Sequence, residues 1–235
     1  MNLDVWGLIL SRLNLKDLLN VRQLCNEFND FICNKKMNKR WIIQPERNNI
    51  SKLNQLNGTK GIVNLYFNLY LCNSGITNEE IKELMNISRL NLRFNNTITN
   101  EGIEGLTNLN SLSLEDNKTI TNEGIKYLTK LTELDLCFNE KITNEGINGL
   151  TNLTYLCLIL NKTITNEGIK GLTNLTHLQL RYCNTITNEG IKGLTNLTNL
   201  DLINNNKITN EGIEGLTNLT NLSLYNSKIT NEGIK

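Results

Sequence analysis

The feature that most constrains the fold of this chain is a unit of 22 residues that it repeats with small changes. Residues 106–215 contain five such units, each of which begins with Leu-Thr and later carries the segment Ile-Thr-Asn-Glu-Gly-Ile. Residues 63–83, 84–105 and 216–235 extend the pattern on both sides with shorter or less regular copies. A fixed period of this length indicates a solenoid, in which each unit packs only against its neighbours.

Apolar residues recur at fixed positions in every unit, and their spacing predicts its local structure. In the unit that starts at residue 172 they are Leu172, Leu175, Leu178, Leu180, Ile186 and Ile191. The alternation around Leu178 and Leu180 predicts a short strand with one buried face. The segment 188–191 then favours the start of a short helix, with its Asn as the N-cap and its Glu in the first turn. The L-x-x-L-x-L spacing resembles that of leucine-rich repeats.

Stacked units of this kind are expected to form a curved α/β solenoid. Neighbouring strands lie about 4.8 Å apart, whereas packed helices need roughly 8–10 Å. The stack must therefore bend, with its strands on the inside and its short helices on the outside. We expect a concave parallel sheet of about eight strands, roughly 35–40 Å long at the usual strand spacing.

Asparagine recurs at the position eleven residues after the first Leu of a unit. The residues are Asn95, Asn117, Asn139, Asn161 and Asn205, and in one unit Cys183 stands there instead. An amide side chain offers both donors and an acceptor. We therefore expect these side chains to be buried and to satisfy backbone groups where each strand turns into the following loop.

Composition and charge exclude several kinds of function. The 24 Lys and Arg residues nearly balance the 23 Asp and Glu residues, and the net charge of +1 indicates no general affinity for nucleic acids or membranes. No apolar run reaches transmembrane length, and the first residues lack the features of a signal peptide. The six cysteines show no paired spacing, so we expect free thiols in a reducing compartment. These features favour the cytoplasm or nucleus.

The first 42 residues lack the repeat and predict three short helices, at residues 4–13, 18–25 and 26–33. Their sequence resembles the F-box, whose pattern begins L-P-x-E-L-L-x-x-I-L-S-x-L. Here Ile-Leu-Ser-Arg-Leu occupies residues 9–13, and Asp-Leu follows at residues 17–18. The chain departs from the pattern at Met1-Asn2, which replaces Leu-Pro, and at Asn26 and Phe28, which replace Lys and Trp.

The F-box resemblance implies a surface for a Skp-type adaptor protein, and through the adaptor a cullin–RING ubiquitin ligase. Because the Leu-Pro turn belongs to the family's adaptor-binding surface, its absence implies an altered adaptor contact. The first helix is apolar beyond one face, which is typical of a helix with a partner. By their place in the pattern, the adaptor contacts would be Val5, Trp6, Ile9, Leu10, Leu13, Asp17, Leu18, Leu24, Cys25 and Phe28.

The repeats separately resemble the F-box/leucine-rich-repeat class, whose units read L-x-x-L-x-L-x-x-C-x-x-I-T-D-x-G-L. Residues 172–191 match this pattern with Asn188 in place of Asp. The two resemblances divide the chain into an F-box-like helical domain (1–42), a linker or cap (43–62) and leucine-rich repeats (63–235) with an incomplete last unit. They imply the substrate receptor of a ubiquitin ligase. The alternatives are a stand-alone leucine-rich-repeat scaffold and a secreted adhesion-type repeat protein, which the missing signal peptide opposes.

The repeats differ from one another mainly at four positions, which lie five, seven, nine and ten residues after the first Leu. Three of these point out of the strand's concave face, and the last lies at its rim. Exposed aromatic and Arg side chains are typical anchors of protein interfaces. We therefore predict that an unknown target protein, with a basic element beside an apolar anchor, contacts Arg89, Arg93, Phe94, Glu115, Asp116, Glu133, Asp135, Phe138, Tyr155, Ile159, Leu160, His177, Arg181, Tyr182 and Tyr225.

The sequence offers little support for catalysis, and we predict no catalytic residue, metal site or cofactor. The single histidine, His177, and Cys157 would lie roughly 8 Å apart on neighbouring strands, without a third group to complete a nucleophilic site. Cys137, Cys157 and His177 would form a diagonal of similar steps, which is too wide for ligands that must lie about 2.0–2.3 Å from one Zn²⁺. No phosphate-binding loop or metalloprotease motif is present.

Overall fold

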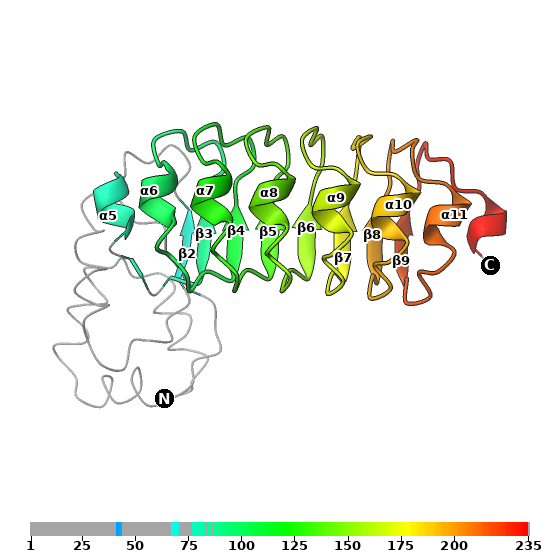
Figure 1. Cartoon of the computed structure of the whole chain (residues 1–235), viewed down its shortest axis with the longest axis horizontal. Helices are drawn as coiled ribbons and strands as arrows, with labels where there is room; N and C mark the ends of the chain where they lie inside the picture. The colour runs from blue at the N-terminus through cyan, green and yellow to red at the C-terminus, as the bar shows by residue number, and fades with distance from the viewer. Residues whose placement is uncertain (1–40, 44–66, 71–76, 83, 86, 235) are drawn as a thin grey trace, which may run out of the picture.

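The computed structural model describes residues 41–43, 67–70, 77–82, 84–85 and 87–234. Within these residues one parallel sheet of nine strands faces a row of short helices, as Figure 1 shows. The strands are β1 (Trp41–Ile43), β2 (Phe67–Tyr70), β3 (Arg89–Asn91), β4 (Ser111–Ser113), β5 (Glu133–Asp135), β6 (Tyr155–Cys157), β7 (His177–Gln179), β8 (Asn199–Asp201) and β9 (Asn221–Ser223). The helices are α5 (Asn78–Lys82), α6 (Asn100–Ile103), α7 (Asn122–Ile125), α8 (Asn144–Ile147), α9 (Asn166–Ile169), α10 (Asn188–Ile191), α11 (Asn210–Ile213) and the 3-10 helix η2 (Asn231–Ile234).

The strands follow one another in chain order, and each pairs with its neighbours in parallel. From β3 onward, residues at equal positions of successive units lie opposite each other, as Leu134, Leu156 and Leu178 do. The pairing continues beyond the strands, where Leu158 N–H donates to the Gln179 carbonyl at 2.9 Å. The 22-residue period therefore sets the register of the sheet.

The apolar positions predicted from the repeat are buried, which confirms the core. In the unit that starts at residue 172, all six of these side chains are at most 1% exposed. One continuous apolar cluster runs from Ile81 to Leu216 between the sheet and the helices. Each unit contributes too little apolar surface for a core of its own, so the repeats must fold as a stack.

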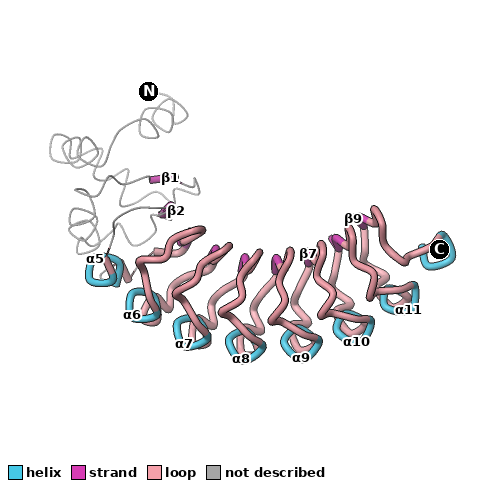
Figure 2. Tube along the Cα trace, turned by 90° about the horizontal axis from the view of Figure 1, so that it is seen from above, coloured by secondary structure: helices cyan, strands magenta, loops and turns pink. Residues whose placement is uncertain are grey.

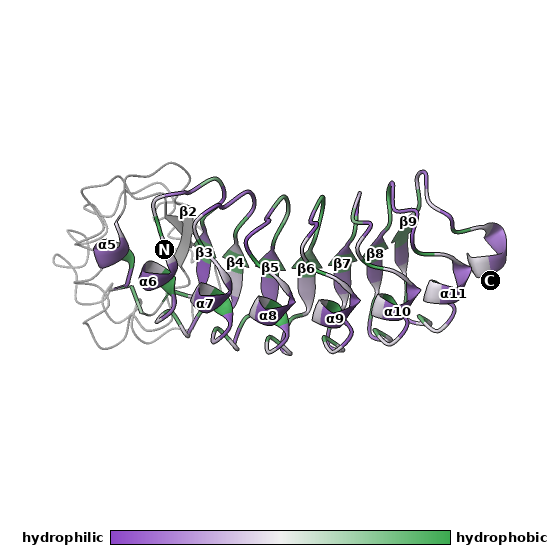
Figure 3. Ribbon diagram, turned by 45° about the horizontal axis from the view of Figure 1, so that its top comes forward, coloured by the Kyte–Doolittle hydropathy of each residue, from purple (hydrophilic) through white to green (hydrophobic). Residues whose placement is uncertain are grey.

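The stack is curved, with the strands on the inner side and the helices on the outer side (Figure 2). This arrangement confirms the predicted α/β solenoid and its direction of bending, which follows from the closer spacing of strands. The concave side of the sheet carries two of the three side chains in each three-residue strand. Figure 3 shows strand β5 in purple and β6 paler, in keeping with Glu133 and Asp135 on the first and Tyr155 and Cys157 on the second.

The sheet contains one more strand than we expected. β1 (Trp41–Ile43) pairs with β2 and lies where the sequence placed the boundary between the F-box-like domain and the linker. The repeat pattern gave no signal there, because residues 41–43 do not carry its leucine spacing. The ten predicted adaptor contacts, from Val5 to Phe28, lie outside the described residues.

The short helices are linked to each other by asparagine side chains, and here the sequence assignment of the N-cap was wrong. The N-cap of α9 is Thr165, and Asn166 is the first helical residue. Thr165 is held by the preceding repeat, where the Asn144 side chain accepts from Thr165 N–H at 2.9 Å and donates to Thr165 Oγ at 2.8 Å. The same pair of contacts recurs at every step from α5 to η2.

The predicted asparagine ladder is confirmed. Asn139 is fully buried, and its amide nitrogen donates to the carbonyls of Leu114 (3.0 Å) and Asn117 (3.2 Å) in the preceding unit. Its side-chain oxygen accepts from the N–H groups of Lys141 and Ile142, both at 2.9 Å. Asn117, Asn161 and Asn205 make the same kinds of contact, so each of these side chains satisfies buried backbone groups of two units at once. These contacts stabilise both the turn and the stack.

Candidate protein-interaction face

The outward positions of strands β3 to β9, with the two residues at the rim that follows each strand, form what we call the concave face. Most of its side chains are half-buried, because each packs against its counterparts in the neighbouring units. The exposed large hydrophobic side chains on it are Phe94 (42%), Phe138 (44%), Tyr182 (50%) and Tyr225 (77%). The sheet therefore presents the variable residues of the repeat side by side on one surface.

The rim position of every unit has a left-handed backbone. The φ angles are close to +54° at Phe94, Asp116, Phe138, Leu160, Tyr182, Asn204 and Asn226. Asn and Asp adopt this conformation most readily after Gly, whereas a large apolar side chain costs roughly 1–2 kcal/mol there. Four of the seven units nevertheless carry Phe, Leu or Tyr, so these residues are not explained by the needs of the backbone.

Two of these apolar rim residues flank a third in the middle of the stack. Phe138, Leu160 and Tyr182 occupy equal positions in successive units, next to the half-buried Tyr155 and Ile159. The ring centroids of Tyr155 and His177 lie 6.4 Å apart. We call Phe138, Tyr155, Ile159, Leu160 and Tyr182 the apolar patch. Phe94 lies two units before it, where the Arg93 guanidinium stacks 4.6 Å from the ring centre, and Tyr225 lies two units after it.

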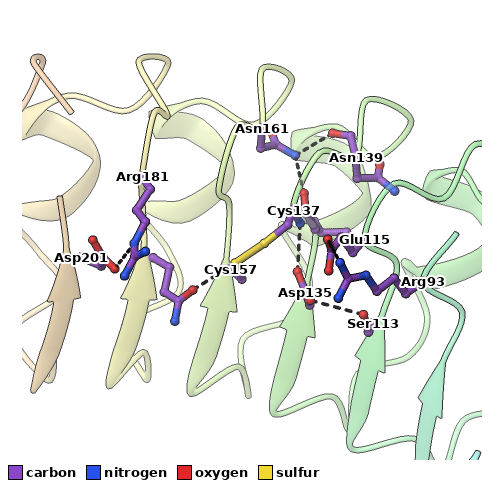
Figure 4. Close-up of a disulfide and its surroundings, with 12 residues drawn as sticks. Arg93, Ser113, Glu115, Asp135, Cys137, Asn139, Cys157, Asn161, Arg181 and Asp201 are labelled. Carbon is purple, nitrogen blue, oxygen red and sulfur yellow. Dashed lines mark hydrogen bonds and ion pairs between the residues drawn. A yellow bond between two sulfur atoms is a disulfide. The ribbon is translucent and has the colours of Figure 1, made fainter. Parts of the chain in front are cut away.

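The acidic residues predicted beside the patch are largely paired within the chain. Figure 4 shows the pair between Arg93 and Glu115 and the pair between Arg181 and Asp201. Arg93 contacts Glu115 at 2.8 Å, and Arg89 on β3 reaches past β4 to Glu133 on β5 at 2.5 Å. Lys118 pairs with Asp116 at 2.5 Å. Arg181, on the other side of the patch, pairs with Asp201 at 2.5 Å. The face is therefore less acidic toward a partner than the sequence alone indicated.

Asp135 differs from the other acidic residues because hydrogen bonds hold its carboxylate in place. It accepts from Cys137 N–H at 3.0 Å and from the Ser113 hydroxyl at 3.3 Å. Burial raises the pKa of Asp135, and these hydrogen bonds oppose the increase. Burial likewise raises the pKa of Glu115, against the effect of Arg93 and with smaller contributions from Asp135 and Asp116. Both carboxyl groups thus lie in a poorly solvated part of the face.

The cysteines next to Asp135 correct two expectations from the sequence. Cys137 and Cys157 form a disulfide, with their Cα atoms 5.9 Å apart, so these two thiols are not free. Strand geometry gave a separation of roughly 8 Å, but β5 ends at Asp135, and the chain after it turns at Phe138. The Cys157 sulfur also contacts the Gln179 side chain at 3.3 Å, whereas His177 Nδ1 contacts the Thr176 hydroxyl. Cys157 and His177 therefore do not form a nucleophile–base pair.

Comparison with protein-family models identifies both parts of the chain. An F-box domain model matches residues 1–40, and a leucine-rich-repeat model matches residues 83–107, 105–128, 127–150, 171–194 and 193–216. The chain is an F-box/leucine-rich-repeat protein. Proteins of this class are typically non-catalytic adaptors, and an F-box implies binding of a Skp-type adaptor. No sequence among curated proteins matches this F-box/leucine-rich-repeat chain.

Solved structures support the repeat fold of this F-box/leucine-rich-repeat protein. An internalin from Listeria monocytogenes is 22% identical, with a TM-score of 0.51 over 72% of this chain and 57% of the internalin. A leucine-rich-repeat protein from Leptospira interrogans is 32% identical, with a TM-score of 0.57 over 71% of this chain and 44% of that protein. The chain thus spans little more than half, or less, of these two structures. None of the helices in the described residues is both long and apolar enough to span a membrane.

Proposed function

We propose that this F-box/leucine-rich-repeat protein is the substrate-recognition subunit of an SCF-type ubiquitin ligase and has no catalytic activity of its own. Its F-box would bind a Skp-type adaptor, and the concave face would bind the protein to be ubiquitylated. Since this machinery operates inside the cell, the protein would act in the cytoplasm or nucleus. The domain limits that accompany this proposal are 1–42 for the F-box and 63–235 for the repeats.

The observation that carries the proposal is the rim of the concave face. Phe138, Leu160 and Tyr182 keep large apolar side chains in a left-handed backbone that favours Asn. Backbone strain of this kind is typical of functional sites. The exposed rings of Phe138 and Tyr182 have the character of interface anchors, and Arg181 beside them supplies a charged group. An apolar segment of the target, flanked by a basic element near Asp135, fits this surface best.

The proposal is tested by separating the two binding surfaces in the full-length chain. Leu10→Asp is expected to abolish co-purification with a Skp-type adaptor and cullin while the repeats stay folded. Phe138→Asp combined with Tyr182→Asp is expected to retain the adaptor and to lose the target. Proteins that associate with the wild type, and whose ubiquitylation disappears with either variant, are the candidate targets.

A matched control lies on the outer side of the stack. Tyr127 is 66% exposed there, on a helix-side segment, so Tyr127→Asp introduces a similar charge away from the concave face. It is expected to leave adaptor and target binding unchanged. If the Leu10→Asp chain retains the adaptor, the F-box assignment of that contact is wrong, and the stand-alone repeat scaffold becomes the better description.

A further inference from the structure

The cluster formed by Asp135, Cys137 and Cys157 is not needed for the fold of the repeats. Equivalent positions in other units hold residues such as Ser113, Glu115 and Gln179, and the sheet continues through them without interruption. In this one place, a carboxylate oxygen and two sulfur atoms lie within 4.8 Å of one another. Cys137 and Cys157 are 6% and 2% exposed, and Asp135 is half-buried beside them. Figure 4 shows the bond between Cys137 and Cys157, with the Asp135 side chain beside Cys137.

We propose that, in its dithiol form, this cluster is a binding site for a thiophilic cation such as Zn²⁺. Cys137 and Cys157 would supply two thiolates and Asp135 a carboxylate oxygen, a set of ligands that Zn²⁺ accepts. The site is separate from the F-box and does not rest on the function proposed above. Neither the repeat pattern nor the family match assigns a metal to it.

The positions of the three side chains suit a shared ion. Two sulfur atoms at about 2.3 Å from one tetrahedral Zn²⁺ lie roughly 3.8 Å apart. The Cα atoms of Cys137 and Cys157 lie 5.9 Å apart, which allows a disulfide. The same backbone also allows two separate thiolates on one ion, because small rotations about the Cα–Cβ bonds move the sulfur atoms apart to the distance that Zn²⁺ requires. The pairing of β5 with β6 fixes the backbone on both sides of the site, with Asp135 directly opposite Cys157.

The surroundings of Asp135 hold its carboxylate in place as a ligand. Oδ1 accepts from Cys137 N–H, and Oδ2 accepts from the Ser113 hydroxyl. Each carboxylate oxygen has a further lone pair for a cation. Hydrogen bonds to the outer lone pairs orient the group, as second-shell contacts do in metal sites. Gln179, whose side-chain oxygen lies 3.3 Å from the Cys157 sulfur, or a water molecule can complete the coordination.

The disulfide and the metal-bound form exclude each other, since only thiolates bind the ion strongly. The disulfide forms when the two thiols lose two protons and two electrons to an oxidant such as oxidised glutathione, which leaves as two molecules of reduced glutathione. In a reducing compartment the dithiol is favoured. The bound cation would then replace the covalent link between the two units. Both thiols would release their protons to solvent, and the two thiolates would balance the charge of the cation.

Cobalt binding tests the proposal in the full-length chain. The metal-free protein, reduced with a phosphine, is titrated with Co²⁺, which reports thiolate ligation through sulfur-to-cobalt charge-transfer absorption and tetrahedral ligand-field bands. We expect one Co²⁺ per chain, displacement by Zn²⁺, and no such bands after oxidation to the disulfide. Cys137→Ser or Cys157→Ser should weaken binding by about 100-fold or more, and Asp135→Asn by roughly 10-fold.

Cys183 provides the matched control, because it is a buried free thiol in the same stack whose sulfur contacts Thr185. Cys183→Ser is expected to leave the cobalt spectrum unchanged. If the serine variants unfold, the wild type still decides the question, since its midpoint of thermal unfolding should rise with Zn²⁺ only when reduced. Unchanged cobalt bands in a folded chain that carries both Cys137→Ser and Cys157→Ser, or no stoichiometric binding by the reduced wild type, would overturn the proposal.

Discussion

At the scale of single residues, the rim of the concave face separates what folding requires from what binding requires. The backbone there is left-handed in every unit from Phe94 to Asn226, and Asn204 and Asn226 satisfy it at little cost. A unit that keeps Phe or Tyr loses stability in exchange for an exposed ring. This trade-off is a common feature of functional surfaces.

An exchange between two rim residues tests this interpretation. Phe138→Asn is expected to raise the free energy of unfolding by about 0.5–1 kcal/mol, because Asn tolerates φ near +54° better, and to weaken target binding. Asn204→Phe should lower the free energy of unfolding by a similar amount. Chemical denaturation of both variants measures the effect. If Phe138→Asn destabilises the protein, the ring contributes packing that outweighs the backbone strain.

Contacts that recur in every unit could be predicted from the sequence, whereas contacts between particular side chains could not. The buried positions and the role of Asn139 followed from the period, because every unit repeats the same surroundings. The Cys137–Cys157 bond could not be predicted from the period, because it joins different positions of two units and Cys137 lies beyond the end of β5. The ion pair between Arg89 and Glu133 was missed for a similar reason, because it joins β3 to β5 past β4 and depends on the length of the Arg side chain.

At the scale of the elements, the helices are too short to be stable alone and depend on contacts between repeats. Asn144 binds Thr165 of the next unit through both atoms of its amide. The glycine of the next helix is required by this contact, since a Cβ on Gly168 would lie 2.5 Å from Asn144 Oδ1. The recurrence of both Asn and Gly in the repeated segment therefore reflects one interaction rather than two separate preferences.

Replacing glycine at two positions of one unit measures this interaction. Gly168→Ala is expected to cost about 1–3 kcal/mol from overpacking against an amide that is held by two hydrogen bonds. This exceeds the gain of about 0.5–1 kcal/mol from Ala in a helix. Gly171→Ala has no atom within 4 Å of the new Cβ and should change stability by less than about 0.5 kcal/mol. Equal unfolding midpoints for the two variants would contradict the role assigned to Asn144.

The elements themselves were predictable in type and order, although not in every boundary. The strand and helix of each unit lie where the leucine spacing put them, because the pattern determines which faces are buried. The N-cap was misassigned to Asn188 instead of Thr187, since the sequence does not reveal that this Asn side chain serves the following unit. β1 was missed because Trp41–Ile43 joins the sheet without the repeat's own signal.

At the scale of the whole molecule, the stack behaves as a one-dimensional array. Each unit contacts its neighbours through strand pairing, the Asn139-type ladder and the Asn144-type links between helices. The interfaces between successive units are nearly identical, so the array can lose a whole unit without a change of register. The variable residues, in contrast, make each unit's contribution to the concave face different. Stability and recognition are therefore separable by removing single repeats.

Two deletions of equal length test this separation. Removing residues 150–171 or residues 194–215 joins a Gly to the Leu that begins the next unit, as in the native chain. At about 0.05–0.15 kcal/mol per residue, each should cost roughly 1–3 kcal/mol and leave the protein folded. The first deletion removes Tyr155, Cys157 and Leu160 and should abolish both target binding and the cobalt spectrum, whereas the second should preserve them.

Deleting only residues 150–160 breaks the register and should unfold the repeats, and circular dichroism with thermal unfolding distinguishes the three outcomes. If the two whole-unit deletions affected binding equally, recognition would be spread along the stack rather than centred on the apolar patch.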